Sequence, residues 1–104
     1  MSRVTRFEEL EAWKRSRVLA RHVYSVSSQG KFCHDRGLSS QIQRAAVSVM
    51  SNIAEGFERY RLPEFHQFLS IAKGSCAELR SQLFVAKDLG YVDENVFASM
   101  MAEA

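Results

Sequence analysis

The sequence predicts an all-α protein, an antiparallel up-down four-helix bundle with a short last helix, in a single domain over residues 1–104. Four segments carry apolar residues at intervals of three and four, which is the period of an amphipathic helix. A chain that is 46% hydrophobic, with one proline and five glycines, also has too few turn residues for a β-sandwich. Its length gives room for one domain with a modest core.

The first helix is predicted from about Arg6 to Val26. Thr5 and Glu8 form a capping box, in which each side chain satisfies a free backbone N–H at the helix start. The next segment, residues 27–37, has two glycines and no apolar period, so we expect a loop in which Phe32 folds back over the bundle end. The apolar face of this first helix consists of Leu10, Trp13, Ala20 and Tyr24.

The second helix is predicted to be capped by Ser39 or Ser40 and to extend to about Tyr60. Ser40 with Gln43 offers another capping box. Pro63 is expected in the first turn of the third helix, where a proline removes no helical hydrogen bond.

The turn between the second and third helices is very short, so these helices must be antiparallel neighbours. Pairing outward from the turn at Leu62 places Met50 near Gly74. Gly90 is expected to end the third helix, and Asp93 to cap a last helix that reaches Ala104.

A glycine at Gly56, inside the second helix, costs about 1 kcal/mol relative to alanine. Something other than helix propensity therefore favours it. Close backbone approach, oligomer packing and a binding surface all remain open.

Two blocks of sequence in this region carry a family resemblance. The first is Ala-Val-Ser at 46–48 followed by Ser-Asn-Ile-Ala-Glu-Gly-Phe at 51–57, and the second is Phe-His-Gln-Phe-Leu-Ser-Ile-Ala-Lys-Gly-Ser at 65–75. Glu-Leu at 78–79 and Leu-Gly-Tyr at 89–91 follow in order. The chain resembles the four-helix-bundle proteins encoded in 23S rRNA intervening sequences, whose relatives include the accessory variability determinant of diversity-generating retroelements.

This resemblance implies a homo-oligomer, with a five-fold ring (a homopentamer) as the leading model, and a reverse transcriptase as one partner to consider. Family members continue further at the C-terminus, so we expect the short last helix to leave apolar surface that a partner subunit covers. The residues expected to hold the assembly or its packing together are Asn52, Glu55, Gly56, Phe57, Lys73 and Gly74.

Charge gives the main functional indication. Residues 1–61 hold eleven basic and six acidic residues, and residues 62–104 hold three basic and six acidic ones, so halves of +5 and −3 make up the net +2. A basic surface neutralises phosphates without reading sequence. We therefore expect a non-enzymatic accessory protein that binds RNA or DNA electrostatically. The predicted contact residues are Lys14, Arg15, Arg17, Arg21 and Arg44, with His22 alongside the first four.

Three alternatives remain open. The basic residues of the first helix form only a solvated helix face if Glu11 pairs with Arg15 at i,i+4. A ring-shaped protein-interaction scaffold without nucleic acid explains the charge split equally well. A selfish passenger of a ribosomal RNA insertion is the third.

Catalysis and metal binding are not expected. Glu55 and Glu78 are the only carboxylates in the two sequence blocks. For this pair, a salt bridge to Arg44 or Arg59, or a hydrogen bond from an N–H group across an interface, is the simpler role. The two cysteines, at 33 and 76, and the histidines lack the spacing of a zinc site. We therefore predict no cofactor.

The chain is expected to be cytoplasmic. It has no apolar run long enough to cross a membrane and no signal-peptide core at its start. Two cysteines do not make a disulfide framework, so free thiols are expected.

Overall fold

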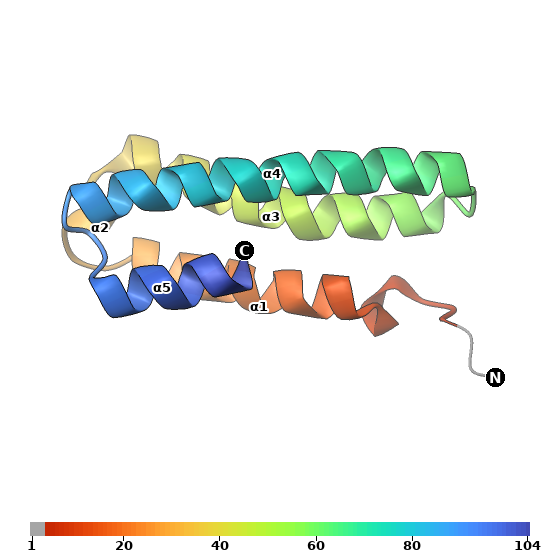
Figure 1. The fold of residues 1–104 in the computed structure, drawn as a ribbon, viewed down its shortest axis with the longest axis horizontal. Helices are drawn as coiled ribbons and strands as arrows, with labels where there is room; N and C mark the ends of the chain where they lie inside the picture. Colours follow the sequence, from red (N-terminus) through yellow and green to blue (C-terminus); the bar gives the residue numbers. More distant parts are fainter. Residues whose placement is uncertain (1–3) are drawn as a thin grey trace.

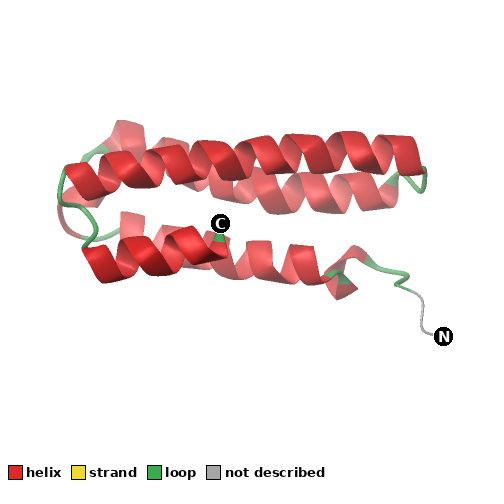
Figure 2. Cartoon of the chain, in the orientation of Figure 1, coloured by secondary structure: helices red, strands yellow, loops and turns green. Residues whose placement is uncertain are grey.

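The computed structural model describes residues 4–104 and shows a chain of helices joined by short connections (Figures 1 and 2). The predicted all-α fold is confirmed. In order, the elements are a 3-10 turn η1 (Phe7–Glu9) and the α-helices α1 (Glu11–Ser27), α2 (Gly30–His34), α3 (Arg36–Glu58), α4 (Leu62–Asp88) and α5 (Glu94–Glu103).

The four longer helices form an elongated bundle measuring 46 × 24 × 17 Å. Helix α3 packs along α4 on one side and α1 on another, and α5 touches both α1 and α4. Figure 1 shows that α5 runs beside only one half of the long helices, next to the end where α2 lies. No helix in residues 4–104 is long and apolar enough to cross a membrane.

The start of the first helix differs from the prediction. Leu10 adopts an extended conformation, so α1 begins at Glu11, and a separate 3-10 turn precedes it. The side chain of Glu9, not of Glu8, accepts hydrogen bonds from the backbone N–H groups of Thr5 at 3.0 Å and Arg6 at 3.2 Å. These bonds lower the pKa of the Glu9 carboxyl. Because the backbone is extended at Leu10, the Leu10 side chain packs against the bundle.

The predicted loop at residues 27–37 contains the short helix α2, and α3 begins earlier than expected. Asp35, not Ser39 or Ser40, caps α3 by accepting the Leu38 N–H at 3.1 Å. Gln43 makes no box with Ser40, because its amide donates to the Ser27 hydroxyl at 2.8 Å. 

The predicted role of Phe32 is confirmed. Its side chain is 1% exposed and stacks on Tyr91 with ring centroids 5.2 Å apart. The Tyr91 hydroxyl in turn donates to Asp35 at 2.9 Å. One set of contacts therefore ties α2, the start of α3 and the turn before α5 together.

The antiparallel pairing of α3 and α4 is also confirmed, close to the predicted register. The hydroxyls of Ser48 and Ser75 lie 2.8 Å apart across the interface. A Cβ built on Gly56 would lie 2.6 Å from the Cβ of Phe68 and 3.0 Å from Cδ1 of Phe65. Close approach between helices therefore explains why glycine is favoured at position 56.

The end of α4 follows the prediction. Gly90 has a φ of +75°, and its N–H bonds the Lys87 carbonyl while the Tyr91 N–H bonds the Ala86 carbonyl. This pair of bonds is the Schellman arrangement that ends many helices. Asp93 then caps α5 by accepting the Val96 N–H at 2.8 Å.

The buried side chains form two clusters. The first cluster includes Met100 of α5, which is fully buried. Its other members are Leu19, Ala20, Val23, Phe32, Ile42, Ala45, Ala46, Leu79, Leu83, Ala86 and Val92. The second cluster consists of Val49, Ile53 and Ala72, with Leu10, Trp13, Leu69 and Cys76 packed against it. Within residues 4–104, α5 contributes side chains to the first cluster and none to the second.

Replacing Gly56 by alanine should destabilise the protein. The new Cβ would overlap the Cβ of Phe68, and this overpacking should outweigh the gain in helix propensity, lowering the free energy of unfolding by about 1–2 kcal/mol. Gly74→Ala is the matched control. Apart from Gly74, its chain neighbours and the local helix backbone, no atom of residues 4–104 lies within 4 Å of a Cβ built there. The same change should therefore raise stability by up to about 1 kcal/mol. Urea unfolding measures both, and equal effects at the two sites would contradict the proposed contact.

The Tyr91 phenol should ionise late. Its hydrogen bond to Asp35, followed by burial, raises its pKa above the ordinary value of about 10. The stabilisation from this bond is therefore complete below pH 10 and is lost as the pH rises through the folded-state pKa. Titration of phenolate absorbance in the folded protein should show a late transition that belongs to Tyr91. Tyr91→Phe should remove this transition, and unfolding should shift it to lower pH. A Tyr91→Phe profile that keeps the late transition would refute this assignment.

Candidate nucleic-acid interface

Three of the predicted contact residues share an exposed face of α1. Lys14, Arg17 and Arg21 stand at i, i+3 and i+7 on this helix, and all three are exposed. Lys14 lies 3.7 Å from Glu11, while the Arg17 guanidinium lies 5.8 Å from the centre of the Trp13 ring. Neither Arg17 nor Arg21 forms an ion pair within residues 4–104. We call these three residues the α1 basic face.

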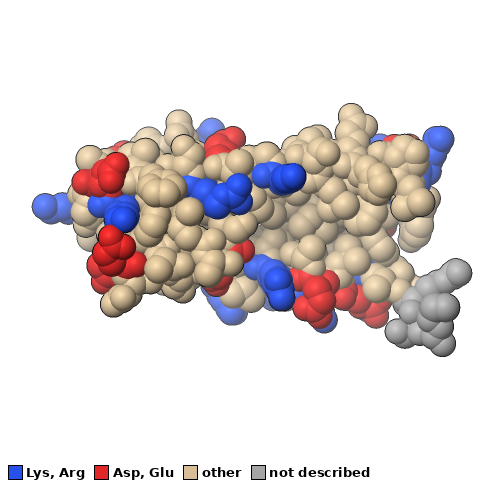
Figure 3. Space-filling view, in the orientation of Figure 1, with Lys and Arg blue, Asp and Glu red and all other residues tan. Residues whose placement is uncertain are grey.

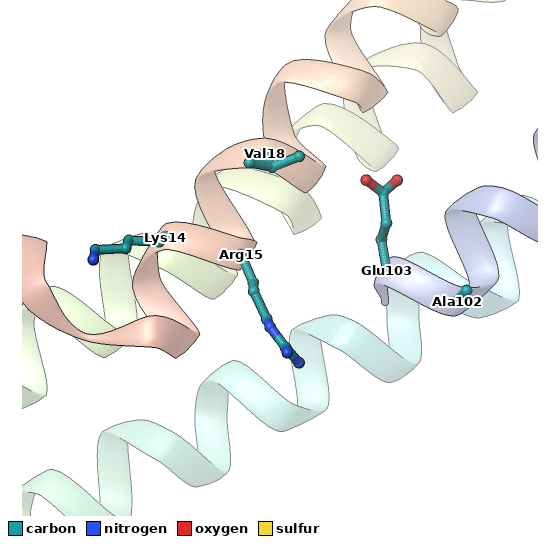
Figure 4. Close-up of a pocket in the computed structure, with 5 residues that line it drawn as sticks. All are labelled: Lys14, Arg15, Val18, Ala102 and Glu103. Atoms are coloured by element: carbon teal, nitrogen blue, oxygen red, sulfur yellow. The ribbon is translucent and has the colours of Figure 1, made fainter.

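Arg15 and His22 lie beside this face, where α1 meets α5. Arg15 and Lys14 both border a cavity of about 370 Å³ that Ala102 and Glu103 of α5 also line. In Figure 4 the Lys14 and Arg15 side chains leave α1 in different directions, and Arg15 points toward the space in front of the end of α5. The His22 ring contacts the Glu103 carboxylate at 2.7 Å, and Arg21 lines a second pocket with these two residues. The α1 basic face therefore adjoins Arg15 and His22 at the α5 side of α1.

The expected Glu11–Arg15 pair is absent from the described residues, since Glu11 contacts Lys14 instead. The spacing of a helix permits either partner, because i,i+3 and i,i+4 neighbours share a face. Arg15 consequently keeps its charge available at the cavity.

Arg44 lies apart from the α1 basic face. Its neighbour Gln43 faces α1 through the hydrogen bond to Ser27. Ser48, one turn after Arg44 and on the same side of α3, meets Ser75 of α4. The structure therefore places Arg44 on the α4 side of α3, where it cannot join the cations of α1 on one continuous surface.

The residues predicted to hold an assembly together differ in their exposure. Gly56 is buried, and Phe57 is half-buried with its ring 6.1 Å from that of Phe65. Lys73 and Gly74 are exposed on α4, and Glu55 is exposed on α3. These last three residues offer surface to another molecule.

Asn52 and Glu55 are used mainly within α3. The Asn52 amide donates to the Ser48 carbonyl at 2.8 Å and to its hydroxyl at 3.0 Å. Glu55 pairs with Arg59 at 3.1 Å, which is one of the salt bridges predicted for Glu55 and Glu78.

A polar seam between α3 and α4 was missed by the sequence reasoning. Ser48, Ser75 and Asn52 form one hydrogen-bonded group at this seam. Gln82 is 9% exposed and its Oε1 has no partner within residues 4–104. The predicted register already placed Ser48 within about one residue of Ser75, so the seam could have been found from it.

Neither thiol shows features of a metal site. Within residues 4–104, no three His, Cys, Asp or Glu side chains come together in a way that could hold a metal ion. Cys33 and Cys76 are free and half-buried. Burial raises the pKa of the Cys76 thiol, partly offset by the charge of Arg80. A raised pKa makes this thiol less nucleophilic at neutral pH.

The sequence is similar to that of a known protein family. Residues 8–104 match the family model described as 23S rRNA-intervening sequence protein. No curated protein sequence matches the chain.

Proposed function

Because the chain belongs to the family of 23S rRNA-intervening sequence proteins, we propose that it is a non-enzymatic accessory protein that binds the phosphate backbone of RNA or DNA. The observation that carries this proposal is the α1 basic face. Its two arginines are exposed and form no ion pair with any described residue, so their charge is available to a polyanion.

The spacing on α1 suits a nucleic-acid strand. Positions i, i+3 and i+7 span about 10 Å along a helix axis. A duplex carries a phosphate about every 3.4 Å of its axis on each strand, so this span matches two or three phosphates. Arg17 and Arg21 supply planar donors that pair well with phosphate oxygens, and Lys14 adds a point charge. Such contacts carry no base readout, so we expect binding without sequence preference.

Self-association would strengthen this binding. The outer surface of α3 and α4 carries exposed Ser51, Gly74 and Ile71. Outside the local helix backbone, no described residue lies within 4 Å of a Cβ built on Gly74. These residues permit close approach of a second chain. In a homo-oligomer, with a ring of five chains as the leading form, the α1 basic face would recur and the phosphate contacts would add up. We further propose that the chain assists a reverse transcriptase or another nucleic-acid enzyme.

A protein-interaction scaffold is the second candidate. It is supported by exposed apolar side chains on α4, where Ile71 is 47% and Val85 44% exposed. Exposed apolar patches of this kind mark protein contacts. Salt separates the candidates, because phosphate binding weakens steeply with salt concentration and apolar association does not.

Reversing the charges of the α1 basic face should abolish nucleic-acid binding. The variant Lys14→Glu, Arg17→Glu, Arg21→Glu replaces three phosphate contacts with repulsion while leaving the core untouched. The neutral variant with glutamine at the same positions should bind weakly. A plot of the logarithm of its binding constant against the logarithm of the salt concentration should have a slope smaller in magnitude by about two to three. Fluorescence anisotropy with a labelled RNA oligonucleotide at several salt concentrations measures both effects.

The matched control is Lys31→Glu, Arg36→Glu, Arg61→Glu, which makes the same change in net charge at exposed positions outside α1. This variant should retain most of the affinity. Equal losses in the two triple variants would show that net charge matters and the α1 basic face does not. Binding by the α1 variant at low salt equal to that of the wild type would reject the assignment.

A further inference from the structure

Tyr24 is exposed on α1, although the sequence pattern predicts it on the apolar face of this helix. It follows the buried Val23 and is turned from it by about 100° around the helix axis, so it lies at the edge of the buried face. Tyr24 is 47% exposed. Within residues 4–104 its ring forms no aromatic pair and no cation–π contact. The ring is therefore available to another molecule.

Tyr24 continues the α1 basic face. It follows Arg21 at i+3 and Arg17 at i+7, and residues at these spacings share one side of a helix. Trp13 precedes Arg17 by four residues, and the Arg17 guanidinium lies 5.8 Å from the centre of the Trp13 ring. Trp13 and Tyr24 are separated by about three full turns of α1. Both arginines therefore lie between two aromatic side chains on the same side of the helix.

The helices around this ring carry almost no negative charge. Residues 12–54, which include nearly all of α1 and most of α3, contain seven Lys or Arg residues and one acidic residue, Asp35. Asp35 is engaged by capping α3 and by the Tyr91 hydroxyl. Glu103 of α5 is engaged by His22. In Figure 3 acidic side chains gather at the N-terminal end of α1, and basic ones lie over the part of the helix that follows.

An exposed ring beside arginines fits a single strand of nucleic acid better than a duplex. Proteins that bind single strands combine cations that follow the backbone with aromatic rings on which bases stack. Unpaired bases can turn outward and stack on such a ring, whereas the bases of a duplex are stacked on one another. Arg17 and Arg21 lie within about 10 Å of Tyr24 along the axis of α1. A strand whose phosphates they bind can therefore bring a base to this ring.

We propose that the α1 basic face binds single-stranded segments of RNA or DNA, with an unpaired base stacked on the Tyr24 ring. Arg17 and Arg21 bind the neighbouring phosphates. Stacking on Tyr24 requires no particular base, because every base has a π-face. This role of Tyr24 rests on the proposed function, since it names the form of nucleic acid that the same surface takes. Phosphate contacts alone would give no preference for unpaired bases.

The test measures binding of the chain to three labelled DNA probes of equal length by fluorescence anisotropy. The probes are an oligothymidine strand, which does not fold on itself, the same strand paired with its complement, and an abasic strand that has phosphates without bases. Tyr24→Ala should weaken binding to the thymidine strand about tenfold, because one stacked base is lost. Its affinity for the duplex and for the abasic strand should not change. The salt dependence of binding should also stay the same, since no charge is removed.

Two variants serve as controls. Tyr24→Phe keeps the ring and removes only the hydroxyl, so it should bind the thymidine strand as tightly as the wild type. Tyr60→Ala removes a tyrosine that is 78% exposed in the turn between α3 and α4, outside the α1 basic face. This variant should leave all three affinities unchanged.

Two results would overturn the role of Tyr24 and leave the proposed function in place. One is a Tyr24→Ala variant that binds the thymidine strand as tightly as the wild type. The other is an equal loss of affinity for all three probes, which would show that the substitution disturbs the phosphate contacts and removes no base contact. A wild-type chain that binds none of the probes at low salt would instead reject the proposed function, and the role of Tyr24 with it.

Discussion

The contact between α3 and α4 at Gly56 sets the positions of the other helices. Because this residue has no Cβ, the two helices approach until the backbone of α3 meets the Phe68 side chain. That approach fixes the register along the whole pair, so that Ser48 meets Ser75 further along. A shift of one turn would separate these hydroxyls and leave Ser75 without this partner. The remaining helices then pack in the grooves that this pair provides.

The exposed surface of α1 follows from that arrangement. Helix α1 buries Leu19 and Val23 against the pair, so its opposite face must be exposed, and there it carries the α1 basic face. Helix α5 packs against both α1 and α4. A polyanion suits the α1 basic face, because this face offers charge without a large apolar area.

Much of the fold could be predicted from local signals, and the failures have a common physical cause. The four long helices, their antiparallel order, the close approach at Gly56 and the ends at Gly90 and Asp93 all follow from residues near one another in the chain. The cap at Asp35 could not be chosen over Ser39, because its second partner, Tyr91, is distant in sequence. Periodicity also placed Arg44 with the cations of α1. The position of Arg44 depends on how α3 is turned toward α4, and this follows from contacts between helices that the local sequence does not contain.

One measurement tests both the assembly of the chain and its binding of nucleic acid through the α1 basic face. Protein purified from cells at low salt would be passed through a size-exclusion column with light scattering, and the absorbance ratio at 260 and 280 nm would be followed. We expect a peak of several chains, with five as the leading number, that carries nucleic acid and loses it in high salt. An oligomer free of nucleic acid at low salt would contradict the claim and favour the scaffold. A monomer without nucleic acid would contradict both the assembly and the binding.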